Sequence, residues 1–68
     1  MRFTVELERE ADGRWIAEVP ELPGVLVYGA DPDEVTARVK ALALRVLADR
    51  LEHGEADSAI NDICFAAA

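Results

Sequence analysis

The sequence predicts a small α+β domain in which a three-stranded antiparallel sheet packs on one long helix, in the order β-β-β-α. Apolar and polar residues alternate over Phe3–Arg9, which is the pattern of a strand with one solvated face. Two more short runs follow, each bounded by Gly or Pro turn signals. After Pro32 no Gly or Pro interrupts the chain until Gly54, and apolar residues recur there with the helical period.

The first two strands are predicted to form a hairpin. Phe3–Arg9 supplies the outgoing strand, and Asp12-Gly13 supplies a strong turn signal, because Gly adopts positive φ without steric cost. Arg14–Val19 returns, with Trp15, Ala17 and Val19 on one face. Pro20 ends this strand because proline has no N–H to donate to a sheet.

A third strand is predicted over Val25–Ala30. It follows the corner Pro20–Gly24, in which Pro23 and Gly24 suit a type II turn. Both faces of this strand are largely apolar, with Leu26 and Tyr28 opposite Val25 and Val27. We therefore expect the strand to be central in the sheet or covered on both sides.

The helix is predicted over Pro32–Glu52 because several signals agree at its start. Asp31 suits the N-cap, Pro32 suits the first helical position, and Asp33 and Glu34 complement the helix dipole in the first turn. The next breaker is Gly54, a natural residue just beyond a helix C-terminus.

The helix has two apolar sectors separated by charged residues. The first is expected to cover the sheet and comprises Val35, Val39, Leu42, Ala43, Val46 and Leu47. The second apolar sector lies nearly opposite and comprises Ala37, Ala41, Leu44, Ala48 and Leu51. A chain of this size has nothing left to place on the second sector, so we predict that it is a subunit interface of a homo-oligomer, a dimer or a tetramer.

The domain is expected to span residues 1–54, with a C-terminal tail over 55–68. The segment 55–59 is polar and turn-like. Ile60–Ala66 alternates weakly and is open to two interpretations, a short fourth strand or a frayed helical turn.

Size and composition support association. The chain has 68 residues, enough for one domain whose core supplies only about 3–5 kcal/mol of net stability. With Cys64 as its one cysteine and His53 as its one histidine, it has neither an intrachain disulfide nor a structural zinc site to supplement that core. Oligomerisation remains as the source of additional stability.

Charge limits the class of partner. Fourteen acidic residues against seven basic ones give a net charge of -7, which disfavours direct nucleic-acid binding and favours a basic protein partner. The alternative interpretation is that the net charge only keeps the protein soluble. No apolar run resembles a signal or membrane segment, so we expect a cytoplasmic protein without membrane association.

The residues do not predict an enzyme, a cofactor or a metal site. Cys64 and His53 lie on different predicted elements, and no motif links them. The candidate partner-binding residues are the three carboxylates of the solvated hairpin face together with the tryptophan: Glu6, Glu8, Glu18 and Trp15. The simpler interpretations are solvation for the carboxylates and core packing for the tryptophan.

The segment Asp12–Val25 carries a family resemblance. The hairpin turn, the aromatic-led second strand and Pro20-Glu21-Leu22-Pro23-Gly24 are followed by Gly29-Ala30-Asp31 and then by Asp33-Glu34-Val35. This succession resembles the HicB-like antitoxin family over residues 1–54. Val25 stands where relatives often have Cys, and the tail from Glu55 onward matches neither DNA-binding domain, helix-turn-helix or ribbon-helix-helix, of full-length relatives.

The resemblance implies a partial ribonuclease H-like fold, in the order βββαβ, that has lost its catalytic acids. It also implies a protein that dimerises or tetramerises and neutralises a small basic messenger-RNA-cleaving toxin by masking the toxin's active site. The first hypothesis is therefore an antitoxin-like binding module. The alternative is an orphan oligomeric accessory or regulatory protein without a toxin partner, and an enzyme is the least favoured third reading.

Overall fold

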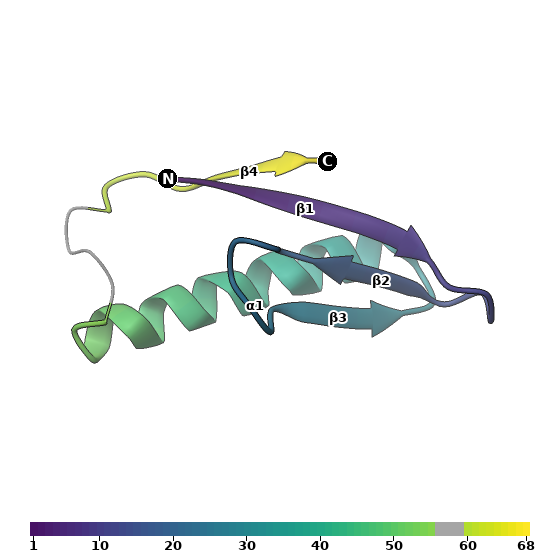
Figure 1. Cartoon of the computed structure of the whole chain (residues 1–68), viewed down its shortest axis with the longest axis horizontal. Helices are drawn as coiled ribbons and strands as arrows, with labels where there is room; N and C mark the ends of the chain where they lie inside the picture. The colour runs from purple at the N-terminus through teal and green to yellow at the C-terminus, as the bar shows by residue number, and fades with distance from the viewer. Residues whose placement is uncertain (56–59) are drawn as a thin grey trace.

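A computed structural model describes residues 1–55 and 60–68 of the chain. The elements are β1 (Arg2–Arg9), β2 (Trp15–Glu18), β3 (Leu26–Gly29), α1 (Pro32–Glu52) and β4 (Cys64–Ala67). The strands form one sheet in the order β3-β2-β1-β4, and α1 covers one face of it (Figure 1). This confirms the predicted α+β class, the β-β-β-α order and the long helix.

β3 lies at one edge of the sheet and its outer side chains are exposed, so the prediction that this strand is central or covered on both sides is wrong. It pairs antiparallel with β2, which pairs antiparallel with β1. The far side of β1 is occupied by β4, and this makes β1 and β2 the inner strands. Leu26 and Tyr28, on the face of β3 away from the helix, are 37% and 44% exposed. Apolar composition on both faces thus did not determine the place of the strand in the sheet.

The C-terminal segment forms a strand, which decides between the two interpretations of the tail. β4 runs parallel to β1 with Phe65 opposite Phe3, and the centroids of these two rings are 5.9 Å apart. The tail therefore converts an antiparallel sheet into a mixed one. The turn expected over 55–59 falls largely on residues 56–59, outside the part of the chain that the structure describes.

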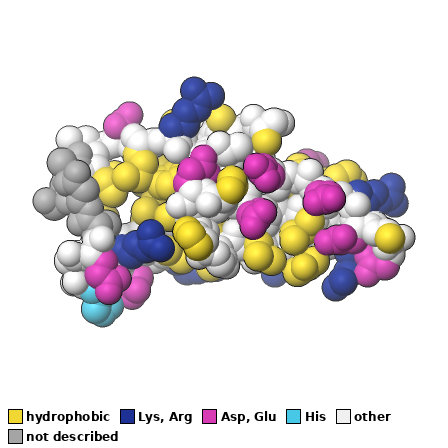
Figure 2. All heavy atoms as spheres, in the orientation of Figure 1, with side chains coloured by type: hydrophobic (Ala, Val, Ile, Leu, Met, Phe, Trp, Pro, Cys, Tyr) yellow, Lys and Arg dark blue, Asp and Glu magenta, His cyan; other side chains and the backbone are white. Residues whose placement is uncertain are grey.

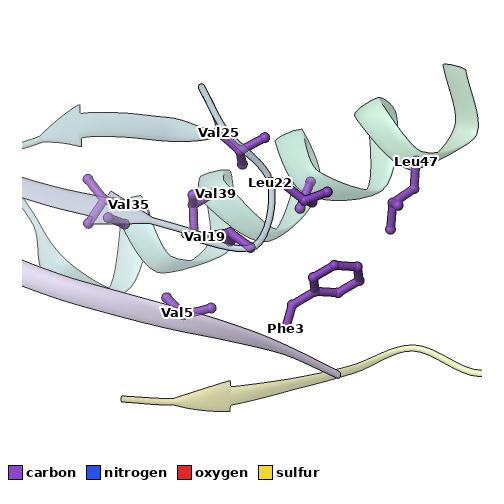
Figure 3. Close-up of a cluster of buried hydrophobic side chains, with 10 residues drawn as sticks. Phe3, Val5, Val19, Leu22, Val25, Val35, Val39 and Leu47 are labelled. Carbon is purple, nitrogen blue, oxygen red and sulfur yellow. The ribbon is translucent and has the colours of Figure 1, made fainter. Parts of the chain in front are cut away.

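The core lies between the helix and the inner face of the sheet (Figure 3). From α1, the four residues Val35, Val39, Ala43 and Leu47 are buried at successive turns, because a spacing of four returns each side chain to the same side of a helix. They meet buried residues of β1, β2 and the corner before β3: Phe3, Val5, Ala17, Val19, Leu22 and Val25. Leu42 and Val46 pack at the margin of this core, so the first apolar sector covers the sheet as predicted.

The ends of α1 lie where the sequence predicted them. The Asp31 carboxylate accepts a hydrogen bond from the Asp33 amide at 2.9 Å, and Pro32 begins the helix. At the other end the chain leaves the helical conformation at His53, and Gly54 adopts a φ of +69°. Asp31 therefore satisfies one of the backbone donors that a helix start leaves without a partner.

The Glu21 carboxylate replaces a missing backbone acceptor beside β1. The Thr4 amide donates to both carboxylate oxygens of Glu21, at 3.0 and 3.1 Å. This occurs just beyond the end of β2, where the chain turns at Pro20. The hydrogen bond from the Thr4 amide holds the pKa of Glu21 below its ordinary value of 4.5, because it favours the ionised form.

This contact predicts a pH dependence of stability. Since the folded-state pKa of Glu21 is depressed, its contribution is present above the unfolded-state pKa and is lost as pH falls through the folded-state pKa. Thermal unfolding at about pH 6 and about pH 3 should show a larger loss of stability in the wild type than in Glu21→Gln. Equal losses in the two proteins would contradict the role of this carboxylate.

Candidate functional site

The face of the sheet away from α1 carries acidic and apolar side chains together. We call it the outer face and define it by Glu6, Glu8, Ile16, Glu18, Leu26 and Tyr28, which alternate with the core-facing residues of β1, β2 and β3. Figure 2 shows acidic side chains interspersed with apolar ones on the side of the molecule where the strands lie in Figure 1. All three predicted carboxylates are therefore brought to one surface.

Two of these carboxylates oppose each other directly. Glu6 and Glu18 are register partners on adjacent antiparallel strands, a position at which Cβ atoms are typically about 4.5–5.5 Å apart. Glu8 is one step further along the same face of β1 and diagonal to Glu18. Among the described residues, no Lys, Arg or His forms an ion pair with any of the three. Among the described residues, no ion pair therefore offsets the repulsion between the facing carboxylates.

Glu18→Gln should therefore stabilise the isolated protein. We expect the free energy of unfolding to rise by about 0.2–1 kcal/mol, since like charges directly opposite in a sheet are destabilising by this order. Urea unfolding at low salt measures the change. Glu55→Gln removes the same charge from an exposed position after the helix and is the matched control. If Glu18→Gln has the same effect in the wild type as in a Glu6→Gln background, the two carboxylates are not coupled.

Apolar side chains that the sequence analysis did not include among the candidate site residues lie beside the carboxylates. Leu26 is the register partner of Glu18, and Tyr28 is the register partner of Ile16. The Arg14 guanidinium lies 5.0 Å from the centroid of the Tyr28 ring and is held at 2.8 Å by the Asp12 carboxylate. Hydrogen bonds from Arg14 lower the pKa of Asp12. The apolar residues at the outer positions of β3 could have identified this part of the surface from the sequence. They were instead expected to be buried, because the strand was expected to be central in the sheet or covered on both sides.

Trp15 does not join the carboxylates. It points to the helix side of the sheet, where it is partly buried and packs against the core. The Arg9 guanidinium lies 5.9 Å from its ring centroid. Of the four predicted partner-binding residues, the sheet therefore groups Glu6, Glu8 and Glu18 and places Trp15 on the opposite face.

The second apolar sector of α1 faces away from the sheet. Leu44 and Leu51 are 45% and 43% exposed, Ala37 and Ala48 are exposed, and Ala41 is half-buried. The nearest buried side chains of α1 lie on its other side, so the fold does not cover this sector within one chain.

The remaining chemical groups are dispersed. Cys64 is exposed on β4, whereas His53 follows α1 and its Nδ1 lies 2.8 Å from the Asp49 carbonyl oxygen. Over residues 1–55 and 60–68, no three His, Cys, Asp or Glu side chains are grouped so as to hold a metal ion. In the same ranges, no helix has both the length and the apolarity needed to cross a membrane.

These observations define a small α+β protein with an acidic and apolar sheet face. Comparison with known proteins finds a similar segment in a UPF0150 protein of Archaeoglobus fulgidus, 38% identical over 40 residues. The segment covers 59% of this chain and 58% of that relative, so the chain spans little more than half the relative's length. No family model matches the sequence, and no solved structure matches it.

Proposed function

We propose that this chain is an antitoxin-like binding module that neutralises a small basic messenger-RNA-cleaving toxin by docking it on the outer face. The observation that carries the proposal is the facing pair Glu6 and Glu18, which has no basic partner among the described residues. A basic side chain placed between these carboxylates would relieve their repulsion and gain two charge-assisted contacts.

The apolar neighbours support a protein partner over a small ion. Leu26 and Tyr28 are each more than a third exposed beside the carboxylates, and protein interfaces combine buried apolar or aromatic contacts with charged rims. The net charge of -7 favours encounter with a basic protein over long range. The class of partner, a toxin, is proposed from the resemblance to HicB-like antitoxins, whose implied βββαβ order matches the element order of this chain.

The proposed role is binding and not catalysis, and it includes self-association. We propose that the second apolar sector of α1 joins copies of the chain into a homo-oligomer, since Leu44 and Leu51 stand exposed on it. Each copy in such an assembly would keep its outer face free, because this sector and the outer face lie on opposite sides of the fold.

The test uses the small basic protein encoded beside this gene, if one is present. Its production should arrest growth and cleave messenger RNA, and co-production of this chain should relieve both effects. Calorimetric affinity should fall on the order of tenfold between about 0.05 and 0.5 M salt, because exposed charges are screened. Glu6→Gln combined with Glu18→Gln should weaken binding on the order of tenfold, whereas Glu55→Gln should leave it nearly unchanged.

Three results would overturn this function. They are the absence of binding, an affinity independent of salt, and equal binding by the Glu6, Glu18 double variant and the Glu55→Gln control. A stable oligomer with no toxin partner would favour the accessory or regulatory protein instead.

A further inference from the structure

We propose that the free edge of β4 pairs antiparallel with β4 of a second copy, so that two four-stranded sheets join into one continuous sheet. This contact is separate from the second apolar sector of α1. It does not depend on the proposed toxin binding, because it follows from the backbone of the sheet and not from the acidic face, whereas the assembly size expected below also uses the helix interface of the proposed function.

Among the residues that the structure describes, β1 occupies one side of the β4 backbone and no strand occupies the other. The Cys64 amide donates to the Met1 carbonyl at 2.8 Å, and the Ala68 amide donates to the Val5 carbonyl at 3.1 Å. In a parallel ladder, alternate residues direct their backbone groups to the same neighbour, so Ala66 faces β1 together with Cys64 and Ala68. The N–H and C=O groups of Phe65 and Ala67 then point to the open edge, because β4 is the last strand in the sheet.

The opposite edge of the sheet is partly closed. The backbone groups of Val25 and Val27 are directed at β2, so those of the alternate residue Tyr28 are directed away from the sheet at its β3 edge. The Arg38 guanidinium donates to the Tyr28 carbonyl oxygen at 3.0 Å. Arg38 also lies 3.8 Å from the Glu34 carboxylate on the same helix. A strand approaching β3 would have to displace this side chain. At the open edge of β4, the corresponding contact among the described residues is a weak one, from the Cys64 thiol to the Phe65 carbonyl oxygen at 3.9 Å.

The composition of β4 favours a second copy as the occupant. Ile63–Ala68 contains no Asp, Glu, Lys, Arg or Pro in a chain of net charge -7, so two copies meet least electrostatic opposition here. Natural edge strands usually carry charge, proline or a bulge that prevents such pairing. The small side chains of Ala66, Ala67 and Ala68 also leave the backbone accessible.

Symmetry then determines the direction of pairing. Two identical edge strands related by a two-fold axis perpendicular to the sheet run antiparallel, and each presents both donors and acceptors from Phe65 and Ala67. Since α1 packs mainly on β2 and β3 (Figure 1), the β4 edge and the second apolar sector can be used together. If the two-fold axes of the two interfaces intersect at right angles, the assembly closes as a tetramer, and this is the assembly expected here.

The test rests on Ala67→Pro. Proline at this position removes only an N–H that points to the open edge, so the fold of the monomer should be retained while pairing is blocked. Ala67→Ser keeps the N–H and is the matched control. Ala66→Pro removes an N–H directed at β1 and should instead release β4 from its own sheet. Light scattering would compare these variants with wild type and with Leu44→Glu.

We expect wild type and Ala67→Ser to be tetramers, Ala67→Pro and Leu44→Glu each to be dimers, and the Ala67→Pro, Leu44→Glu double variant to be a monomer. Residue-resolved amide exchange in the wild type gives a second readout: Phe65 and Ala67 should become protected as concentration rises, while Ala66 is protected throughout. The proposal is overturned if folded Ala67→Pro has the mass of the wild type, if the wild type stays monomeric, or if protection at Phe65 and Ala67 does not change with concentration. Loss of assembly in Leu44→Glu alone, with those amides unprotected, would support only the helix interface.

Discussion

Replacing Gly29 by alanine should lower the free energy of unfolding by about 1–3 kcal/mol, the usual cost of overpacking a core. A Cβ atom at Gly29 would lie 2.5 Å from Cγ1 of Val35. Val35 is fully buried and β-branched, so its side chain has little freedom to move away. A domain of this size holds only about 3–5 kcal/mol, and the substitution should therefore remove a large part of its stability.

The sign of the change in unfolding free energy distinguishes the steric conflict with Val35 from the effect of the substitution on backbone entropy. Without a steric conflict, replacing glycine by alanine stabilises a protein by about 0.4–1 kcal/mol, because the unfolded chain loses freedom. Urea unfolding measures the change, and Val35→Ala provides the matched background. Val35→Ala alone should cost about 2 kcal/mol through lost burial and cavity formation, and Gly29→Ala should cost much less when added to it. A neutral or stabilising Gly29→Ala would show that α1 does not approach β3 this closely.

Leu44→Glu should shift the protein toward a smaller assembly and lower its apparent stability. Leu44 is 45% exposed within one chain, so the substitution has little to disrupt in the fold itself. Its effect should arise from burying a carboxylate in the proposed helix interface, where an unpaired charge is costly. Because stability gained by association depends on protein concentration, the wild-type melting temperature should rise with concentration, and that of the variant should rise less.

Arg45→Gln is the matched control for this experiment. It changes the net charge by the same amount, and Arg45 is an exposed residue outside the second apolar sector. Light scattering should show an unchanged assembly for Arg45→Gln. If Leu44→Glu has the same mass as the wild type, the second apolar sector is not an interface.

Local signals predicted much of this fold because they act within a few residues. The bounds of α1 follow from Asp31 and Pro32 at one end and Gly54 at the other, and capping is a contact between near neighbours. The alternation over β1 predicted which side chains face the core and which carboxylates share the outer face. The register that places Glu6 opposite Glu18 was not predicted, because it depends on the pairing of two separate strands.

The sequence by itself determined the types of the first three strands and the helix, the helix bounds, the core-facing sector of α1 and the grouping of Glu6, Glu8 and Glu18. Only the tertiary structure decided the strand order, because the pairing of Phe3 with Phe65 joins residues at opposite ends of the chain. β3 pairs only with β2 and so lies at an edge, and the helix covers the other face of the sheet, which leaves Leu26 and Tyr28 on the surface beside the carboxylates. The pairing of β4 with β1 makes β4 the other edge. The periodicity of apolar residues predicts which face of an element is apolar. Whether another element covers that face depends on contacts between residues that are distant in sequence.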